Sequence, residues 1–199
     1  MTDLKLAKQT DLHSKQVISS FIYTIFLLCC IIFLLLTFNI LSIDDLLSFD
    51  QPISLLVFTS VSSVGLILYG VFLSYIISSQ FIDETNKTFK DYSIFSIFIF
   101  MLVTSFYEEL LFRAIIQNIA FILLNNEWFA IGIATVIFLL FHTRYFKNPL
   151  MLVNIILPSL VFGWIYMLTN NLFVPFITHF LSNVVMTLLF KFNIIILKK

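Results

Sequence analysis

The strongest constraint on this chain is the length of its uncharged, apolar runs. Val17–Leu41 and Ile53–Ile82 contain no charged residue, and Asn148–Phe190 contains no formally charged one. Each is long enough to cross a bilayer, because a helical span needs about 20 apolar residues. Backbone groups in lipid must pair within helices or closed barrels, and these continuous runs differ from the short alternating segments of a barrel. The sequence therefore predicts an all-α, polytopic transmembrane helical bundle.

Two further apolar runs bring the expected number of spans to about six. Ser93–Leu124 is one, Trp128–His142 is a shorter one, and Thr169–Asn171 divides the last long run into two spans. Pro52 is expected to open a helix, because a missing N–H costs least in the first turn. Ser93–Leu124 would be about 48 Å long as one helix, against a hydrocarbon core of about 30 Å. Its start, Ser93–Phe100, is therefore expected to lie partly in the cytoplasmic interface.

The basic residues predict how these spans are oriented. Six spans place the amino-terminal tail, the loops Asp83–Tyr92 and Thr143–Asn148, and the carboxyl-terminal tail on one side of the membrane. All Lys and Arg residues except Arg113 lie on that side, and cytoplasmic segments are enriched in these residues. Both termini are therefore expected in the cytoplasm. The residues on that side are Lys5, Lys8, Lys15, Lys87, Lys90, Arg144, Lys147, Lys191, Lys198 and Lys199.

Composition narrows the class of protein. The chain is 60% hydrophobic and 11% charged, with a formal net charge of zero, which is typical of an integral membrane protein and suggests no nucleic-acid partner. Cys29 and Cys30 are adjacent and unsuited to bridging each other, so we interpret them as packing residues. The richness in Ile, Phe, Asn and Lys points to a low-GC bacterium, and so to the bacterial cytoplasmic membrane. We treat residues 1–199 as a single membrane domain, with a cytoplasmic tail at 1–16 and a motif-bearing core at about 93–190.

Three charged residues interrupt the third run. Glu108, Glu109 and Arg113 are the only charged residues between Ser93 and Leu124, and ionisable residues inside a membrane are rare and usually functional. Glu109 and Arg113 are four residues apart and can pair on one helix face. Glu108 lies about 100° away around the helix and is left to act as a general base or acid in a polar cavity. The purely structural interpretation is that Glu109 and Arg113 form only a buried ion pair and that Glu108 is a structural carboxylate.

Two histidines complete the set of candidate site residues. His142 ends the fourth run, and His179 lies four residues before Asn183, so that both can point into one cavity. With Glu108, these groups could activate a water and stabilise an oxyanion. Glu108, His142 and His179 could instead bind zinc, although no HExxH motif is present. Taken singly, each histidine could also be an interhelical hydrogen-bond donor.

The motifs that carry these residues resemble one family of membrane proteases. Glu108–Arg113 (EELLFR) is similar to the EExxxR motif of the CAAX-protease and bacteriocin-processing family, also called Abi proteins. Phe138–His142 (FLLFH) is similar to the family's FxxxH motif, and His179–Asn183 (HFLSN) to its HxxxN motif. The order and rough separations also match. The resemblance covers about Tyr107–Val185.

The resemblance implies a role for each residue. Glu108 and His142 would activate the attacking water, His179 and Asn183 would support the oxyanion, and Glu109 and Arg113 would support the site. The family has been described both as metalloproteases and as metal-independent glutamic proteases, and we favour the second description, with no cofactor. This chain departs from the family in having Ala114 where many members have Gly after the Arg. It also has fewer spans than the eukaryotic CAAX enzymes, which leaves a prenylated substrate in question.

These observations predict an intramembrane endopeptidase that acts on a peptide precursor or a membrane-associated protein, in contact with membrane lipids. A non-proteolytic membrane partner, such as a bacteriocin self-immunity or sensor-regulating protein, is the alternative. A small transporter or proton relay is a third hypothesis, against which the lack of a paired set of Gly- or Pro-interrupted helices counts. The substrate and the oligomeric state stay open.

Overall fold

The computed structural model describes residues 2–77, 89–146 and 149–195, and the side chains from Gln16 onward with Arg144 left out. The described residues are helical apart from short connections and one isolated bridge between Leu47 and Asn171. This confirms the all-α fold. The elements are α1 (Thr2–Thr37), α2 (Ile43–Leu47), α3 (Pro52–Ile76), α5 (Ile94–Glu109), η2 (Leu110–Gln117), α6 (Asn118–Leu124), α7 (Glu127–Leu140), η3 (Thr143–Tyr145), α8 (Pro149–Thr169) and α9 (Phe173–Lys191).

The apolar helices agree with about six membrane spans. Five are long and apolar enough to cross a bilayer, and α7 is a shorter apolar helix. Pro52 stands in the first turn of α3 as expected. The chain is thus a multi-pass membrane protein. The five long segments are Gln16–Thr37, Pro52–Ile76, Ile94–Leu124, Pro149–Thr169 and Phe173–Lys191.

Two elements add to the sequence-based expectation. The polar segment before the first span is helical from Thr2 onward, because α1 continues without a break to Thr37. The acidic segment after α1 also forms a short helix, α2, whose first turn is closed by a capping box. In it, Asp45 N–H donates to Ser42 Oγ, and Ser42 N–H donates to Asp45 Oδ2 at 2.7 Å.

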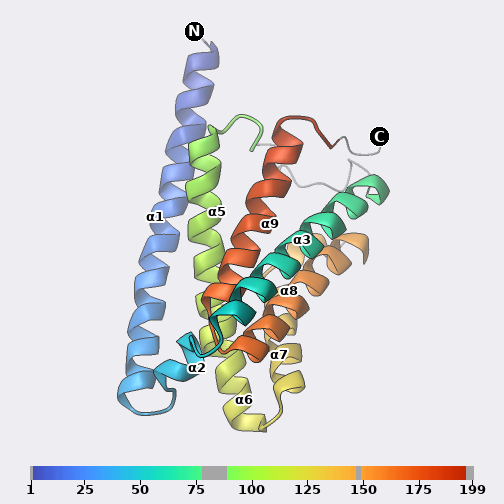
Figure 1. Ribbon diagram of the computed structural model, residues 1–199. Coiled ribbons are helices and arrows are strands. Elements are labelled where there is room, and N and C mark those ends of the chain that lie inside the picture. The colour runs from blue at the N-terminus through green and yellow to red at the C-terminus, as the bar shows by residue number, and fades with distance from the viewer. Residues whose placement is uncertain (1, 78–88, 147–148, 196–199) are drawn as a thin grey trace.

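The spans form a bundle with α9 near its centre (Figure 1). α9 contacts α5 on one side and α3 and α8 on the other, α1 packs along α5, and α7 packs against α8. The start of α1, the start of α5 and the end of α9 lie at the same end of the bundle. This arrangement agrees with an even number of spans. Lys87, Lys147, Lys198 and Lys199, on which the predicted orientation partly rests, lie outside the described residues.

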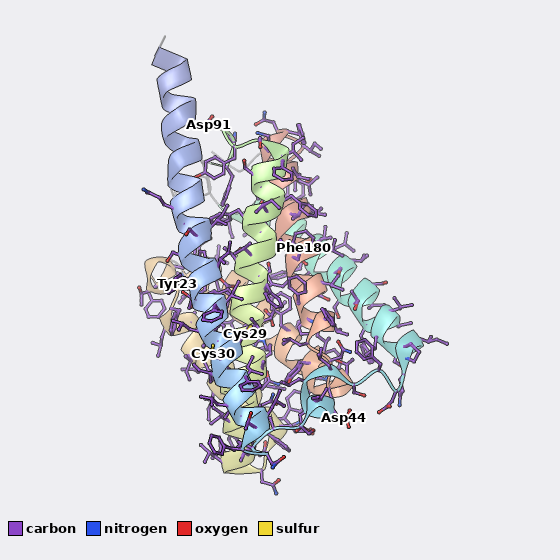
Figure 2. The ribbon with its side chains drawn as sticks, turned by 90° about the vertical axis from the view of Figure 1, so that its left-hand side faces the viewer. Tyr23, Cys29, Cys30, Asp44, Asp91 and Phe180 are labelled. Atoms are coloured by element: carbon purple, nitrogen blue, oxygen red, sulfur yellow. The ribbon has the colours of Figure 1, made fainter. Side chains whose placement is uncertain are left out.

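α1 presents an outer face along the edge of the bundle (Figure 2). Tyr23, Cys29 and Cys30 are exposed on this helix. The interpretation of the two cysteines as packing residues is therefore wrong, because α1 packs through one side only and the cysteines lie on another. In a bilayer this outer face is expected to contact lipid.

The turn between α8 and α9 is anchored to α2, which fixes where α9 begins. Asn171 is fully buried, and its Nδ2 donates to the main-chain oxygen of Ser48 at 2.7 Å. Its Oδ1 accepts from the N–H of Phe173, the first residue of α9, at 2.9 Å. Asn170 adopts a left-handed conformation with φ 44° that turns the chain. The position of His179, two turns into α9, follows from this anchor.

Candidate active site

The three charged residues Glu108, Glu109 and Arg113 lie where the helix changes its winding. Glu109 is the last residue of α5, and the following eight residues, including Arg113, form the π-helix η2. π-helical turns are rare and occur often at functional sites. Arg113 Nε donates to Glu109 Oε2 at 3.0 Å, so the predicted pair between these residues is present.

The guanidinium of Arg113 is held by neutral groups as well as by Glu109. It is fully buried, and its Nη2 donates to Ser159 Oγ at 3.1 Å. Ser159 Oγ in turn donates to Thr135 Oγ1 at 3.2 Å. The Arg113 carbon Cζ lies 6.0 Å from the centroid of the Phe162 ring, within cation–π range. The ion pair thus connects α5 and η2 to α8 and α7.

Sequence reasoning did not identify Ser159 or Thr135 as part of this site. Both are single polar residues in apolar runs, and both are buried. Such residues are common in membrane helices, where they hydrogen-bond between helices. The occurrence of a single polar residue in an apolar run could have marked Ser159 and Thr135 as interhelical hydrogen-bond partners, but it did not identify Arg113 as the residue they support.

His179 connects the first motif to the third. Its Nδ1 lies 2.7 Å from Glu109 Oε1, and its Nε2 lies 3.6 Å from Glu108 Oε2. Because an ionised carboxylate only accepts hydrogen bonds, Nδ1 carries the proton in this contact. The imidazole also stacks on Phe162, with ring centroids 4.6 Å apart. The ring is therefore fixed on its face by Phe162 and at Nδ1 by Glu109, with Nε2 directed toward Glu108.

The two glutamates differ in burial. The Glu109 side chain is 1% exposed and bonded to two partners, whereas the Glu108 side chain is 20% exposed. Glu108 interacts electrostatically with His142 as well as with His179. The expected division between an enclosed Glu109 and a more open Glu108 is therefore present in the structure.

His142 lies just beyond the end of α7 and is half-buried. Its Nδ1 lies 2.8 Å from the main-chain oxygen of Phe138, so Nδ1 carries the proton and Nε2 is left with its lone pair. The His142 ring also packs on the Phe138 ring, with centroids 4.5 Å apart. Phe138 packs edge-on against Phe112 of η2, one residue before Arg113. The second motif is thereby attached to the first through aromatic contacts.

Asn183 is half-buried and lies one turn beyond His179 on α9. Among the residues that the structure describes, the hydrogen bonds of the site join Glu109, Arg113, His179, Ser159 and Thr135, and do not include Asn183. Its predicted role therefore rests on its place on α9, and it stays a prediction.

The zinc alternative, with Glu108, His142 and His179 as ligands, stays a prediction. Within residues 2–77, 89–146 and 149–195, no group of three or more His, Cys, Asp or Glu side chains is arranged to hold a metal ion. Glu109, the carboxylate nearest to His179, is already neutralised by Arg113.

Comparisons with known proteins cover this same region of the chain. Residues 90–185 match the family model described as "Type II CAAX prenyl endopeptidase Rce1-like". The uncharacterized protein YpbD of Bacillus subtilis (strain 168) is 31% identical over 108 residues, which is 54% of this chain and 52% of that protein. The match thus spans about half of the curated relative. No solved structure matches this chain.

Proposed function

Because residues 90–185 belong to the Rce1-like family, we propose that this multi-pass membrane protein is an intramembrane endopeptidase. The match to this family supports protease activity. The observation that carries the proposal is the position of His179, with Nδ1 on Glu109 and Nε2 3.6 Å from the more exposed Glu108. This arrangement places a carboxylate and an imidazole so that both can contact one small molecule, such as a water, that lies between them.

Glu108 is the general base of the proposed reaction. It takes a proton from a water, and the water oxygen forms a bond to the scissile carbonyl carbon. His142 assists, because its Nε2 lone pair can accept a hydrogen bond from the same water. The carbon–nitrogen bond then breaks, and the proton held by Glu108 passes to the leaving amine. The products are a carboxylic acid and an amine.

His179 and Asn183 stabilise the oxyanion. Glu109 accepts from Nδ1 of His179 and so holds the imidazole in place, and in the imidazolium form Nε2–H would be the donor to the oxyanion. Asn183 lies one turn away on the same helix and can add an amide donor. Arg113 keeps Glu109 ionised, and Ser159 holds the guanidinium. These three residues position the site and do not contact the reacting atoms.

The substrate is proposed to be a peptide or membrane-associated protein that reaches the site from the cytoplasmic side, on which the basic residues are expected. The description of the family names CAAX prenyl endopeptidases, so a prenylated carboxyl-terminal tail is one candidate. Bacteriocin or pheromone precursors and membrane-protein fragments are the other candidates.

The test uses the purified full-length protein in liposomes, with quenched peptides that carry or lack a prenyl group. Wild type is compared with Glu108→Gln and His142→Ala, and with Asp44→Asn as a control in an exposed carboxylate of α2. We expect cleavage by wild type and Asp44→Asn, and loss of cleavage in the other two variants. Cleavage that survives in Glu108→Gln would overturn the proposed base.

A cell phenotype separates the protease from a non-proteolytic partner when no peptide in the set is cleaved. The gene carrying Glu108→Gln is compared with wild type and with a deletion. A protease variant should behave like the deletion. A Glu108→Gln strain that behaves like wild type would favour the partner alternative.

A further inference from the structure

η2 and α8 run side by side in the same direction, and their polar contacts follow one register. Arg113 Nη2 donates to Ser159 Oγ at 3.1 Å, and Gln117 Nε2 donates to the main-chain oxygen of Gly163 at 3.0 Å. Both contacts join residues 46 positions apart. We call this polar contact between the two helices, from Arg113 to Gln117, the η2–α8 seam. It leads away from the catalytic candidates toward the end of the bundle where α6 meets α7.

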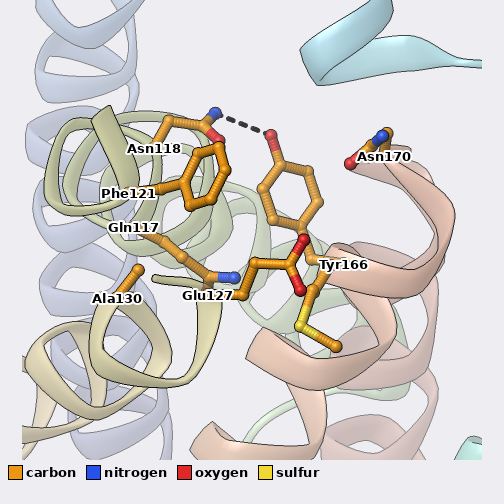
Figure 3. A pocket seen from close by; sticks show the side chains of 8 residues that line it. Gln117, Asn118, Phe121, Glu127, Ala130, Tyr166 and Asn170 are labelled. Carbon is orange, nitrogen blue, oxygen red and sulfur yellow. Dashed lines mark hydrogen bonds between the residues drawn. The ribbon is translucent and has the colours of Figure 1, made fainter. Parts of the chain in front are cut away.

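A small cavity lies at that end (Figure 3). It has a volume of about 50 Å³ and is lined by Gln117, Asn118, Glu127, Ala130 and Tyr166 among others. The donors on its inner wall are already used. Asn118 Nδ2 donates to the hydroxyl of Tyr166 at 2.8 Å, and that hydroxyl donates to a main-chain oxygen of α2. The inner wall therefore offers no free donor from Asn118 or Tyr166, and the Glu127 carboxylate and the Asn170 amide also line the cavity.

Two buried polar atoms of the seam lack a hydrogen-bond partner among the described residues. They are Arg113 Nη1, which is a donor, and Gln117 Oε1, which is an acceptor. Leaving such atoms unsatisfied is costly, and hydrocarbon around the bundle offers no alternative. The two residues are four apart, so their side chains are neighbours on one helix face. A water that entered the seam could satisfy both atoms, because it can accept from Arg113 Nη1 and donate to Gln117 Oε1.

We propose that the η2–α8 seam binds water that is continuous with the outer cavity and reaches the Arg113 guanidinium. The cavity volume is enough for a few waters, since one needs roughly 10–15 Å³ on this measure. This path would hydrate the buried ion pair from the side opposite the catalytic candidates, and it does not depend on the protein being a protease.

Gly163 controls the width of the seam. A Cβ placed there would lie 3.0 Å from Gln117 Oε1 and 3.0 Å from Ile131 Cγ2. Gly163→Ala would therefore push the Gln117 amide from its position. This gives a variant that should block the path without removing either unpartnered atom.

The test measures reaction of single cysteines with Ag⁺, a small ion that enters narrow aqueous paths. The background is Cys29→Ser with Cys30→Ser, both exposed positions, in detergent-purified protein checked for monodispersity. The reporters are Ala130→Cys in the cavity wall and Ser159→Cys at the inner end of the seam. Ala114→Cys is the control, because Ala114 is also on η2 and fully buried but lies in an apolar cluster with α1.

We expect Ala130→Cys to react fastest and Ser159→Cys to react at least tenfold faster than Ala114→Cys. Adding Gly163→Ala should slow Ser159→Cys at least tenfold and leave Ala130→Cys unchanged. Thr135→Cys, next to Ser159, replaces the inner reporter when Ser159→Cys does not fold. A Ser159→Cys rate equal to that of Ala114→Cys would mean that the seam is dry. A fast rate that Gly163→Ala leaves unchanged would mean access from the catalytic side, and either result overturns the proposal.

Discussion

His179 Nδ1 lies 2.7 Å from Glu109 Oε1, although the two residues are 70 positions apart in the chain. The bond joins the last turn of α5 to α9, and Arg113 occupies the other oxygen of the same carboxylate. Glu109 is therefore the residue through which the first and third motifs are held together. Glu108, the next residue back, shares none of these bonds and keeps the greater exposure.

Glu109→Gln should destabilise the protein by about 3 kcal/mol, because it leaves the Arg113 charge buried without its partner. The double variant with Arg113→Gln should be less destabilised than the sum of the two single variants, since it removes both charges. Reversible denaturant unfolding in mixed micelles, followed by circular dichroism, measures the free energy of unfolding of wild type, the two single variants and the double variant. Additive losses would show that Glu109 and Arg113 do not act as a pair.

Glu108→Gln should have little effect on stability, in contrast to Glu109→Gln. We expect its stability to stay within about 1 kcal/mol of wild type, because the side chain is partly exposed and its contact with His179 Nε2, at 3.6 Å, is longer than the bonds of Glu109. Peptide cleavage should fall at least about 100-fold, the usual contribution of a general base. Initial rates with the best quenched peptide, together with the same unfolding measurement, check both parts. A large loss of stability with retained cleavage would assign Glu108 a structural role.

Much of this arrangement could be predicted from local sequence. Uncharged runs give the spans, and a spacing of four residues gives the Glu109–Arg113 pair, because both depend only on residues near one another in the chain. The π-helical winding of Leu110–Gln117 could not be predicted, since an apolar pattern does not reveal one extra residue per turn. The contact of His179 with Glu109 also required the packing of α5 against α9, which no local pattern contains.

Variants of Ser159 test whether its hydroxyl stabilises the buried Glu109–Arg113 ion pair. Ser159→Ala removes the acceptor for Arg113 Nη2 and should cost about 1–3 kcal/mol of stability, the usual cost of a buried donor left unpaired. Ser159→Thr keeps the hydroxyl and should restore most of the loss. If Ser159 also positions Glu109 and His179, Ser159→Ala should lower kcat while KM changes little. Comparison of kcat, KM and the unfolding midpoint for the two variants separates positioning from packing.

Chelation tests the proposed metal-free reaction. Dialysis against a strong chelator should leave the rate of peptide cleavage within about twofold of the untreated enzyme, because the proposed proton transfers use Glu108, with the histidines and Asn183 as hydrogen-bond partners. The measurement compares initial rates before chelation, after chelation and after addition of zinc. Loss of activity that zinc restores would contradict this prediction and move Glu108, His142 and His179 to the role of metal ligands.

The turn between α8 and α9 offers a matched pair of variants for the placement of His179. Asn171→Ala removes the bonds to Ser48 and to the first turn of α9 and should cost about 1–3 kcal/mol. Asn170→Gly should change stability by only a few tenths of a kcal/mol, since glycine adopts the positive φ of Asn170 without strain. Because His179 lies two turns beyond this anchor, Asn171→Ala should also lower kcat, whereas Asn170→Gly should not. Thermal unfolding and cleavage rates of both variants decide whether the anchor on α2 positions the catalytic helix. Equal effects of the two substitutions would show that it does not.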